Sequence, residues 1–496
     1  MLFRSAIYIK EEVSIMSNTT QALSRIEAIL DDSSFVEIGA RVTARATDFN
    51  MQEKKAPSDG VITGYGVVNG NLVYVYSQDA SVLGGTIGEM HAKKIASLYE
   101  KAMKMGAPVV GLIDCAGLRL QEATDALNGF GEIYKNMSLA SGIIPQITAV
   151  YGECGGGLAV LAELSDFVFV EEKKAKLFVN SPNALDGNYE SKLDTSSAKF
   201  MAEAGVVDFV GDEETIANGV RQLVSMLPSN NAEGTVCTDN QDDLNRVCQD
   251  MEAEIADPAL ALTDISDDGV FVETKAEYAK EMVTGFILVD GVTVGAVANR
   301  TALYDENGEK AEEFAPVLTT AGAYKAAEFV TFCNAFEIPV LTLTNVKGFE
   351  ATVKSERTIA KAAAKLVYAF SNADVPKVNI ITGEAYGSAY VAMNSKSIGA
   401  DMVYAWPQAS IGMMDASLAA KIMYADDIAA SKDVTSTINE KAAEYAALQS
   451  SVDQAAARGY VDTIINPEDT RKYVAAAFEM LFDKREVRAD KKHGTV

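Results

Sequence analysis

Short apolar runs alternate with longer amphipathic segments along most of the chain. Residues 109–115 (VVGLIDC) and 146–152 (QITAVYG) are apolar runs rich in β-branched residues, and glycines follow each of them. Such runs, separated by segments of helical periodicity, are typical of buried parallel strands joined by crossover helices. Asn69-Gly70 and Asp290-Gly291 each lie within an alternating segment and predict a tight hairpin. The pattern therefore predicts an α/β fold.

This order of elements occurs twice. The residues 337–351 and 373–390 repeat the pattern of 106–120 and 142–159 with a constant offset, and a weaker match links 63–75 to 284–296. The aligned pairs, each 231 residues apart, are Pro108 and Pro339, Gly117 and Gly348, Pro145 and Pro376, Gly152 and Gly383, and Gly156 and Gly387. We interpret the two halves as copies of one fold.

The length of 496 residues also favours two domains, because one hydrophobic core rarely supports so long a chain. We predict a leader over 1–19, with Met16 as a plausible true start, a first domain over 20–255 and a second over 256–496. Residues 227–269 are rich in Asp, Asn and Ser and predict a linker between the copies. From about Asp433 the pattern again predicts an amphipathic helix, followed by a charged tail.

Composition excludes several function classes. Acidic residues outnumber Lys and Arg 70 to 43, and the net charge of −27 disfavours binding to nucleic acid or anionic lipid. The two histidines, His91 and His493, are too few for chemistry centred on histidine, and we expect His91 to be packed or exposed on a helix rather than catalytic. The five cysteines are scattered without a C-x-x-C spacing, so we expect reduced thiols and no metal. With no long apolar run, we expect a soluble cytoplasmic protein.

The residues that repeat between the halves are glycines at strand ends rather than acids or bases. Glycines there let backbone N–H groups converge on a substrate oxygen and form an oxyanion hole. The donors predicted in the first half are Gly117, Leu118, Gly156 and Gly157, and those in the second half are Gly348, Gly387, Ser388 and Ala389. The alternative is that each glycine only permits a tight turn from strand to helix.

Several segments carry a family resemblance. Glycines placed after parallel strands resemble the crotonase-like fold. The segments DGVITGYG (59–66), ASGIIPQITAV (140–150) and MNSKSIGADMVYAWP (393–407) are similar to the biotin-dependent carboxyltransferase family. This is the subunit type of propionyl-CoA and acetyl-CoA carboxylases, transcarboxylase and methylmalonyl-CoA decarboxylase. The similarity runs from about residue 20 into the C-terminal region and so covers both halves.

The resemblance implies tandem crotonase-like (ClpP/crotonase) domains with parallel sheets and flanking helices. It implies transfer of a carboxyl group between a malonyl-type acyl-CoA, with methylmalonyl-CoA or propionyl-CoA favoured, and biotin on a separate carrier. The first half would hold the acyl-CoA and the second the biotin. The implied partners are a biotin carboxyl carrier protein, a biotin carboxylase or membrane decarboxylase subunits, and further copies of this chain in a hexameric trimer of dimers.

The resemblance also suggests substrate contacts beyond the backbone donors. Val391, beside Tyr390, stands where the family lines its acyl pocket, and an apolar side chain there suits a methyl-bearing acyl group. Arg119 is our candidate for a CoA phosphate. Lys173, Lys174 and Lys176 are weaker candidates, because a solvated charge run explains them equally well.

Two further features bear on biotin. The tetrapeptide Ala102-Met103-Lys104-Met105 matches the attachment sequence of biotin carriers, but it ends a helical pattern, so we expect the biotin to be carried by another chain. Arg357-Thr358 replaces two family glycines, and Lys361 and Ala363 depart from the family as well. Two alternatives stay open: a biotin-independent crotonase-like enzyme acting on acyl-CoA, such as a hydratase or decarboxylase, and a non-catalytic assembly subunit.

Overall fold

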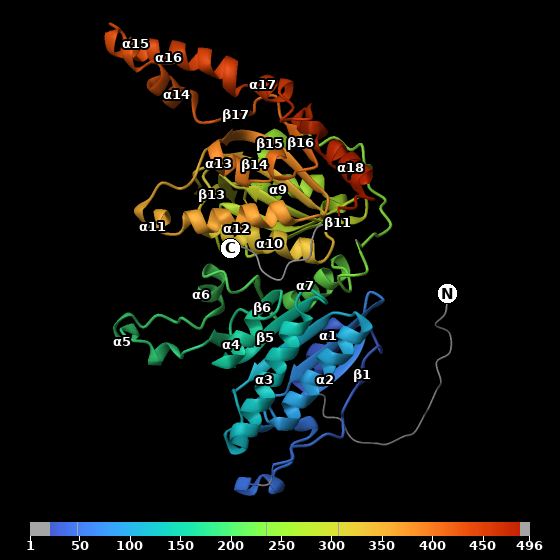
Figure 1. Ribbon diagram of the computed structural model, residues 1–496. Helices are drawn as coiled ribbons and strands as arrows, with labels where there is room; N and C mark the ends of the chain where they lie inside the picture. Colours follow the sequence, from blue (N-terminus) through green and yellow to red (C-terminus); the bar gives the residue numbers. More distant parts are fainter. Residues whose placement is uncertain (1–19, 47, 235, 306, 487–496) are drawn as a thin grey trace.

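The computed structural model describes residues 20–46, 48–234, 236–305 and 307–486. The predicted leader (1–19) and the end of the charged tail (487–496) lie outside these residues. Within these residues each half of the chain forms an eight-stranded sheet with helices on both faces. The two halves are stacked, with the first half below the second in Figure 1.

The first sheet has the order β1-β2-β3-β4-β5-β6-β8, and β7 extends the pairing of β5. Its strands are β1 (Val36–Glu37), β2 (Val61–Val68), β3 (Asn71–Gln78), β4 (Val109–Cys115), β5 (Gln146–Gly155), β6 (Phe167–Glu171), β7 (Lys176–Phe178) and β8 (Phe209–Gly211). Strands β1 to β3 pair antiparallel, and the others pair parallel. The predicted hairpin at Asn69-Gly70 is confirmed, because both residues have the positive φ angles (49° and 84°) that this turn requires.

The second sheet repeats this topology in the order β18-β16-β15-β14-β11-β10-β9, and β17 pairs with β15. Its strands are β9 (Phe271–Thr274), β10 (Met282–Val289), β11 (Val292–Asn299), β14 (Val340–Val346), β15 (Lys377–Tyr386), β16 (Met402–Ala405), β17 (Ser410–Gly412) and β18 (Thr463–Ile464). The hairpin predicted at Asp290-Gly291 joins β10 to β11. A separate two-stranded ribbon consists of β12 (Ala302–Tyr304) and β13 (Lys310–Glu313).

Helices cover both faces of each sheet in corresponding positions. On the first sheet, one face carries α2 (Glu89–Met105) and α3 (Ala123–Ala140), and the other carries α1 (Gln21–Ile29) and α7 (Glu213–Met226). On the second sheet the counterparts are α10 (Thr320–Ala335) with α12 (Ile359–Asn372), and α9 (Pro258–Ile265) with α18 (Thr470–Leu481). The remaining helices are α4 (Gly157–Glu163), α5 (Asn188–Ser191), α6 (Ala198–Glu203), α8 (Met251–Glu254), α11 (Val353–Glu356), α13 (Gly387–Ala392), α14 (Ala416–Met423), α15 (Ala425–Ala430), α16 (Val434–Tyr445) and α17 (Val452–Ala457).

Residue alternation along the strands explains why both faces need helices. In β4, Val110 and Leu112 belong to the core under α1 and α7, while Val109 and Ile113 belong to the core under α2 and α3. All four side chains are fully buried. A strand that is apolar on both sides is stable only between two layers, as the sequence pattern predicts for parallel sheets.

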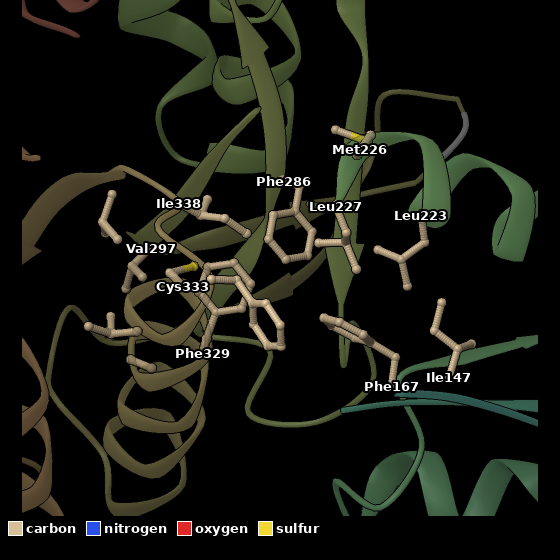
Figure 2. Close-up of a cluster of buried hydrophobic side chains, with 14 of the residues drawn as sticks. Ile147, Phe167, Leu223, Met226, Leu227, Phe286, Val297, Phe329, Cys333 and Ile338 are labelled. Atoms are coloured by element: carbon tan, nitrogen blue, oxygen red, sulfur yellow. The ribbon is translucent and has the colours of Figure 1, made fainter. Parts of the chain in front are cut away.

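A cluster of aromatic side chains joins the two halves. Phe167 of β6 lies with its ring centroid 5.9 Å from that of Phe286 of β10 and 4.9 Å from that of Phe332 of α10. Figure 2 shows Phe167 reaching from the first half toward Phe286 and Phe329 of the second. Because this cluster belongs to the same hydrophobic core as α1 and α7, one core extends across the junction of the halves.

The segment predicted as a linker is partly structural. Thr238 donates a backbone hydrogen bond to Gly291 O at 2.8 Å, and Cys248 and Met251 are buried in the core of the second half, as is one face of α9. The prediction of a polar linker is therefore wrong for residues 248–265, whose polar residues cap helices and pair with backbone groups. Asp257, for example, is the N-cap residue of α9. The division of the chain between residues 255 and 256 stays a prediction.

A projecting arm and the length and polarity of the helices bear on function. Helices α14 to α16 form an arm that projects from the second sheet (Figure 1), and α16 confirms the amphipathic helix predicted after Asp433. Within the part of the chain that the structure describes, no helix is long and apolar enough to cross a membrane.

Candidate active site

The turn after β4 presents one backbone N–H group. Ile87 donates to Gly117 O and accepts from Arg119 N, both at 2.9 Å, so Ile87 and Leu118 form a parallel bridge. Because Gly117 O and Arg119 N, on either side of Leu118, both bond to Ile87, the Leu118 N–H points away from Ile87. Within the described residues it has no hydrogen-bond acceptor. Gly117 has a φ of 106°, which a non-glycine residue rarely adopts.

The adjacent strand β5 brings a second group to the same edge. Cys115 and Cys154 pair across β4 and β5, so the turns that follow the two strands lie side by side. The N–H of Gly156 donates to Phe178 O at 2.8 Å, which gives this predicted donor another acceptor. Gly157 is the first residue of α4, and its N–H has no acceptor within the helix. The first half thus offers Leu118 and Gly157 as donors.

The second half repeats the same clamp 231 residues later. Leu318 donates to Gly348 O at 2.9 Å and accepts from Glu350 N at 3.0 Å, and it forms a parallel bridge with Phe349. The Phe349 N–H of this turn therefore points away from Leu318, as the Leu118 N–H points away from Ile87. Val346 and Ala385 pair across β14 and β15 as Cys115 and Cys154 do in the first half.

Helix α13 supplies the neighbouring donors of the second turn. It begins at Gly387, whose φ is 62°, and Ser388 and Ala389 complete its first turn. The backbone N–H groups of these three residues have no hydrogen-bond acceptor within the described chain. They therefore remain able to bind an oxygen that approaches the end of β15.

The glycines of the donor turns differ in how much space surrounds them. A Cβ atom added at Gly117, Gly156 or Gly348 would meet no atom within 4 Å, so these turns border open space that a substrate oxygen can enter. At Gly157 a Cβ would lie 2.5 Å from the Phe130 ring, so this glycine is also required for packing. Tyr134 donates to Gly157 O at 2.5 Å and fixes the start of α4.

Arg119 does not lie at the surface as a phosphate ligand would. Its side chain is 2% exposed, and its guanidinium pairs with Asp59 at 2.6 Å and with Glu122 at 2.7 Å. Neither acid was predicted as a site residue. Nothing in the local sequence links Arg119 to Asp59, 60 positions earlier, although Glu122 lies within one helical turn of it.

The lysines proposed for phosphate contacts lie in the turn from β6 to β7 and at the first residue of β7. Lys173, Lys174 and Lys176 pair with Glu172, Glu213 and Asp194 at 2.7, 3.8 and 2.7 Å. These exposed pairs are of the kind expected for a solvated charge run.

Tyr390 and Val391 lie on α13, directly after the second group of donors. Val391 is 36% exposed, while Tyr390 packs against the core, and burial raises the pKa of its hydroxyl to about 12. Arg357 and Thr358 are exposed at the junction of α11 and α12, where the hydroxyls of Thr358 and Thr320 are 3.2 Å apart.

An ion pair beside the second turn was not anticipated. Lys347 directly precedes Gly348, and its ammonium lies 2.9 Å from a carboxylate oxygen of Glu384. This pair raises the pKa of Lys347. The position that corresponds to Lys347 in the first half is Ala116. A cation that appears in only one copy of the repeat is the sequence feature that could have pointed to this pair.

The remaining titratable candidates are structural. His91 is fully buried, its ring nitrogens lie near Asp59 O and Gln78 Nε2, and burial lowers its pKa to about 3. Of the two positions that were expected, packed or exposed on a helix, the structure shows the packed one. Lys104 lies in the last turn of α2, as the helical pattern predicted for its tetrapeptide. No group of acidic, cysteine and histidine side chains in the described residues could hold a metal ion.

Comparisons with known proteins agree with this architecture. A family model described as the carboxyl transferase domain matches residues 17–496. The methylmalonyl-CoA decarboxylase subunit alpha of Propionigenium modestum is 39% identical over 493 residues, which cover 97% of this chain and 93% of that protein. The propionyl-CoA carboxylase beta chain of Roseobacter denitrificans is 38% identical over 489 residues, covering 96% and 93%.

Among solved structures, transcarboxylase 12S with hydrolysed methylmalonyl-coenzyme A bound matches with a TM-score of 0.88 and 35% identity, over 96% of this chain and 92% of that one. The predicted fold of duplicated α/β domains is thereby confirmed. Because the family model spans nearly the whole sequence and the two relatives are matched over 93% of their lengths, the chain belongs to the carboxyl transferase family.

Proposed function

We propose that this chain moves a carboxyl group between a malonyl-type acyl-CoA, with methylmalonyl-CoA and propionyl-CoA favoured, and biotin on a separate carrier. The observation that carries the proposal is the pair of clamped turns, at Leu118 and Phe349, 231 residues apart. A single oxyanion hole would serve a simple hydratase or decarboxylase. Two such turns, one in each half, fit a reaction with two oxygens to stabilise.

In the first half the thioester oxygen would accept hydrogen bonds from the Leu118 and Gly157 N–H groups. When the bond between the α-carbon and the carboxyl group breaks, its electron pair moves into the thioester and leaves an enolate oxygen. Backbone donors bind the charged enolate oxygen more strongly than they bind the neutral thioester oxygen. In comparable sites each donor lowers the activation free energy by about 3 kcal/mol. No histidine is needed for this step, in agreement with the low pKa and burial of His91.

In the second half the Phe349, Ser388 and Ala389 N–H groups would hold the oxygen of the biotin ureido ring. The open space beside Gly348 and the absence of competing acceptors for these donors in the described chain fit the binding of such an oxygen. Biotin would supply the ring nitrogen that takes up the carboxyl group, and the proton that this nitrogen loses would go to the α-carbon of the enolate. The residues of this chain bind and orient the ring.

We further infer that one complete site uses two copies of the chain. The donor turns of one chain belong to different sheets, and Val391, the candidate for the acyl pocket, lies on the half assigned to biotin. The arm also exposes Leu418, Ile422 and Met423 at 51%, 62% and 62%, an apolar surface suited to contact with another copy. The transcarboxylase relative is described as a hexamer.

The same proposal places the chain in the cytoplasm. There it would work with a biotin carboxyl carrier protein and with biotin carboxylase or membrane decarboxylase subunits.

A biotin-independent decarboxylase is the second candidate. It is favoured by Arg357 and Thr358, which replace glycines of the resemblance pattern with exposed side chains, and Thr358 lines the same cavity as Glu350 of the second turn. Under this reading only the first turn would act on substrate.

An isotope assay separates these functions. The purified protein is incubated with carboxyl-labelled methylmalonyl-CoA, with and without a biotinylated carrier or free biotin. The transferase proposal expects label to be transferred to biotin, and label loss to depend on it. Label loss that is equal without biotin would support the second candidate. No turnover of malonyl-CoA or methylmalonyl-CoA under either condition would contradict both and favour an assembly role.

A further inference from the structure

A buried cluster of charged side chains lies directly behind the first donor turn. The Arg119 guanidinium contacts Asp59 Oδ1 at 2.6 Å, Glu122 Oε1 at 2.7 Å and Thr86 O at 2.7 Å. The side chains of all three charged residues are at most 3% exposed. Burying three charges costs desolvation free energy unless each charge is paired and hydrogen-bonded. The presence of this cluster behind the turn therefore needs a physical reason.

The cluster ties the turn to three other segments. Thr86 accepts from the Arg119 side chain, and the next residue, Ile87, exchanges backbone hydrogen bonds with the turn. Glu122 accepts the Glu89 N–H at the start of α2 at 2.6 Å. Asp59, which lies just before β2, accepts the His91 N–H at 2.8 Å. Both the backbone and the side chain of Arg119 therefore hold the segment that fixes Leu118.

The second half provides an internal control. It has the same backbone clamp, but Glu350 stands in the position of Arg119. Glu350 is half-buried and lines a cavity of about 700 Å³, and within the described chain it forms no salt bridge. The turn can therefore form without a buried ion cluster. The cluster is an addition to the first turn rather than a requirement of the fold.

We propose that Arg119 is a positioning residue, which holds the Leu118 N–H in line with the thioester oxygen, and that it is not a phosphate ligand. The inference rests on the proposed function, because that function places the thioester at this turn. The fork of the guanidinium is what reaches two carboxylates and a carbonyl together. A lysine keeps the charge but cannot span all three.

The test compares R119K with a matched variant, R471K. Arg471 is also fully buried and pairs with Asp267 and Asp242 at 2.7 and 3.1 Å, but it joins α18 to residues 242–267 and contacts neither turn. We expect both variants to lower the melting temperature by similar amounts. We expect R119K alone to lower kcat, by about 100-fold with KM changed less than about threefold, because a donor displaced by 1 Å loses that much rate.

Each outcome separates one reading from another. If kcat of R119K falls no further than that of R471K, the cluster is merely structural and the proposal is overturned. If R119K instead raises KM and no longer distinguishes methylmalonyl-CoA from its dephospho-CoA analogue, Arg119 is a phosphate ligand. If the wild-type protein shows no transfer to biotin and no decarboxylation in the same assay, the proposed function fails first, and this inference fails with it.

Discussion

Asp114 occupies the space that a side chain at Gly152 would need, since a Cβ atom there would lie 2.1 Å from Asp114 Oδ1. Asp114 also pairs with the buried Arg25 at 3.0 Å. The second half repeats the arrangement, with Asn345 Oδ1 2.7 Å from a Cβ at Gly383. A glycine of the repeat is thus explained by the packing of a polar side chain, just before the donor turn.

We expect Gly152→Ala to destabilise the protein by about 1–3 kcal/mol, because the methyl group displaces Asp114 and breaks its pair with Arg25. Urea unfolding of the two proteins measures the difference. Gly131→Ala is the control: it lies on the exposed face of α3 with no atom near its Cβ, and it should be neutral or stabilising by up to about 1 kcal/mol. Equal stability of G152A and wild type would contradict the close approach.

The donor role of Leu118 can be tested without changing a side chain. Replacing the residue by its α-hydroxy analogue turns the amide into an ester and removes the N–H while the side chain stays the same. We expect kcat to fall about 100-fold or more, as for other single oxyanion donors.

The same replacement at Phe349 is the matched control, because each ester also weakens one carbonyl, Gly117 O or Gly348 O, that accepts a hydrogen bond. The Phe349 ester should slow transfer to biotin while leaving thioester binding intact. Activity of the Leu118 ester within about threefold of wild type would refute the donor assignment.

The local elements could be predicted well from the sequence, and the site only in part. Strands β4 and β14 begin and end where their apolar runs do, because short-range pattern determines them. The constant offset located both turns. The pattern could not show that the N–H of Gly156 is satisfied by Phe178, which β7 brings alongside, or that Arg119 turns inward to Asp59. Such pairings depend on tertiary contacts between segments far apart in sequence.

The cysteines should differ sharply in reactivity. Cys237 is exposed, whereas Cys115, Cys154, Cys248 and Cys333 are buried, and burial raises the pKa of the Cys115 and Cys248 thiols to about 12. Since the thiolate is the reactive form, we expect one thiol of the native protein to react quickly with Ellman's reagent and the others only after unfolding. C237S should abolish the fast phase, and a fast phase that survives this substitution would contradict the burial of the others.

Carboxyl groups at the junction of the two halves should make stability depend on pH. Asp208 lies just before β8, and burial raises its pKa to about 6. Burial also raises the pKa of Asp166, just before β6, to about 7. Lys275 and Lys325 of the second half oppose the shift at Asp208, while Glu328 of α10 adds to it. Asp208 still accepts the Val168 N–H at 2.9 Å, so an amide could replace the carboxyl group there.

The sign of the effect follows from which state binds more protons. With a folded pKa of about 6 and an unfolded pKa of about 4, Asp208 is protonated more fully in the folded protein between these values, so its contribution is present below pH 4 and lost as the pH rises through 6. We therefore expect D208N to gain about 3 kcal/mol in unfolding free energy relative to wild type between pH 4 and pH 7, with no further change above. Urea unfolding across this range measures the difference, and D186N, at an exposed site, controls for the substitution itself. For D166N the gain over wild type should develop up to a pH about one unit higher than for D208N, because burial raises the pKa of Asp166 to about 7. A pH-independent difference between D208N and wild type would show that the junction does not hold this carboxyl in its neutral form.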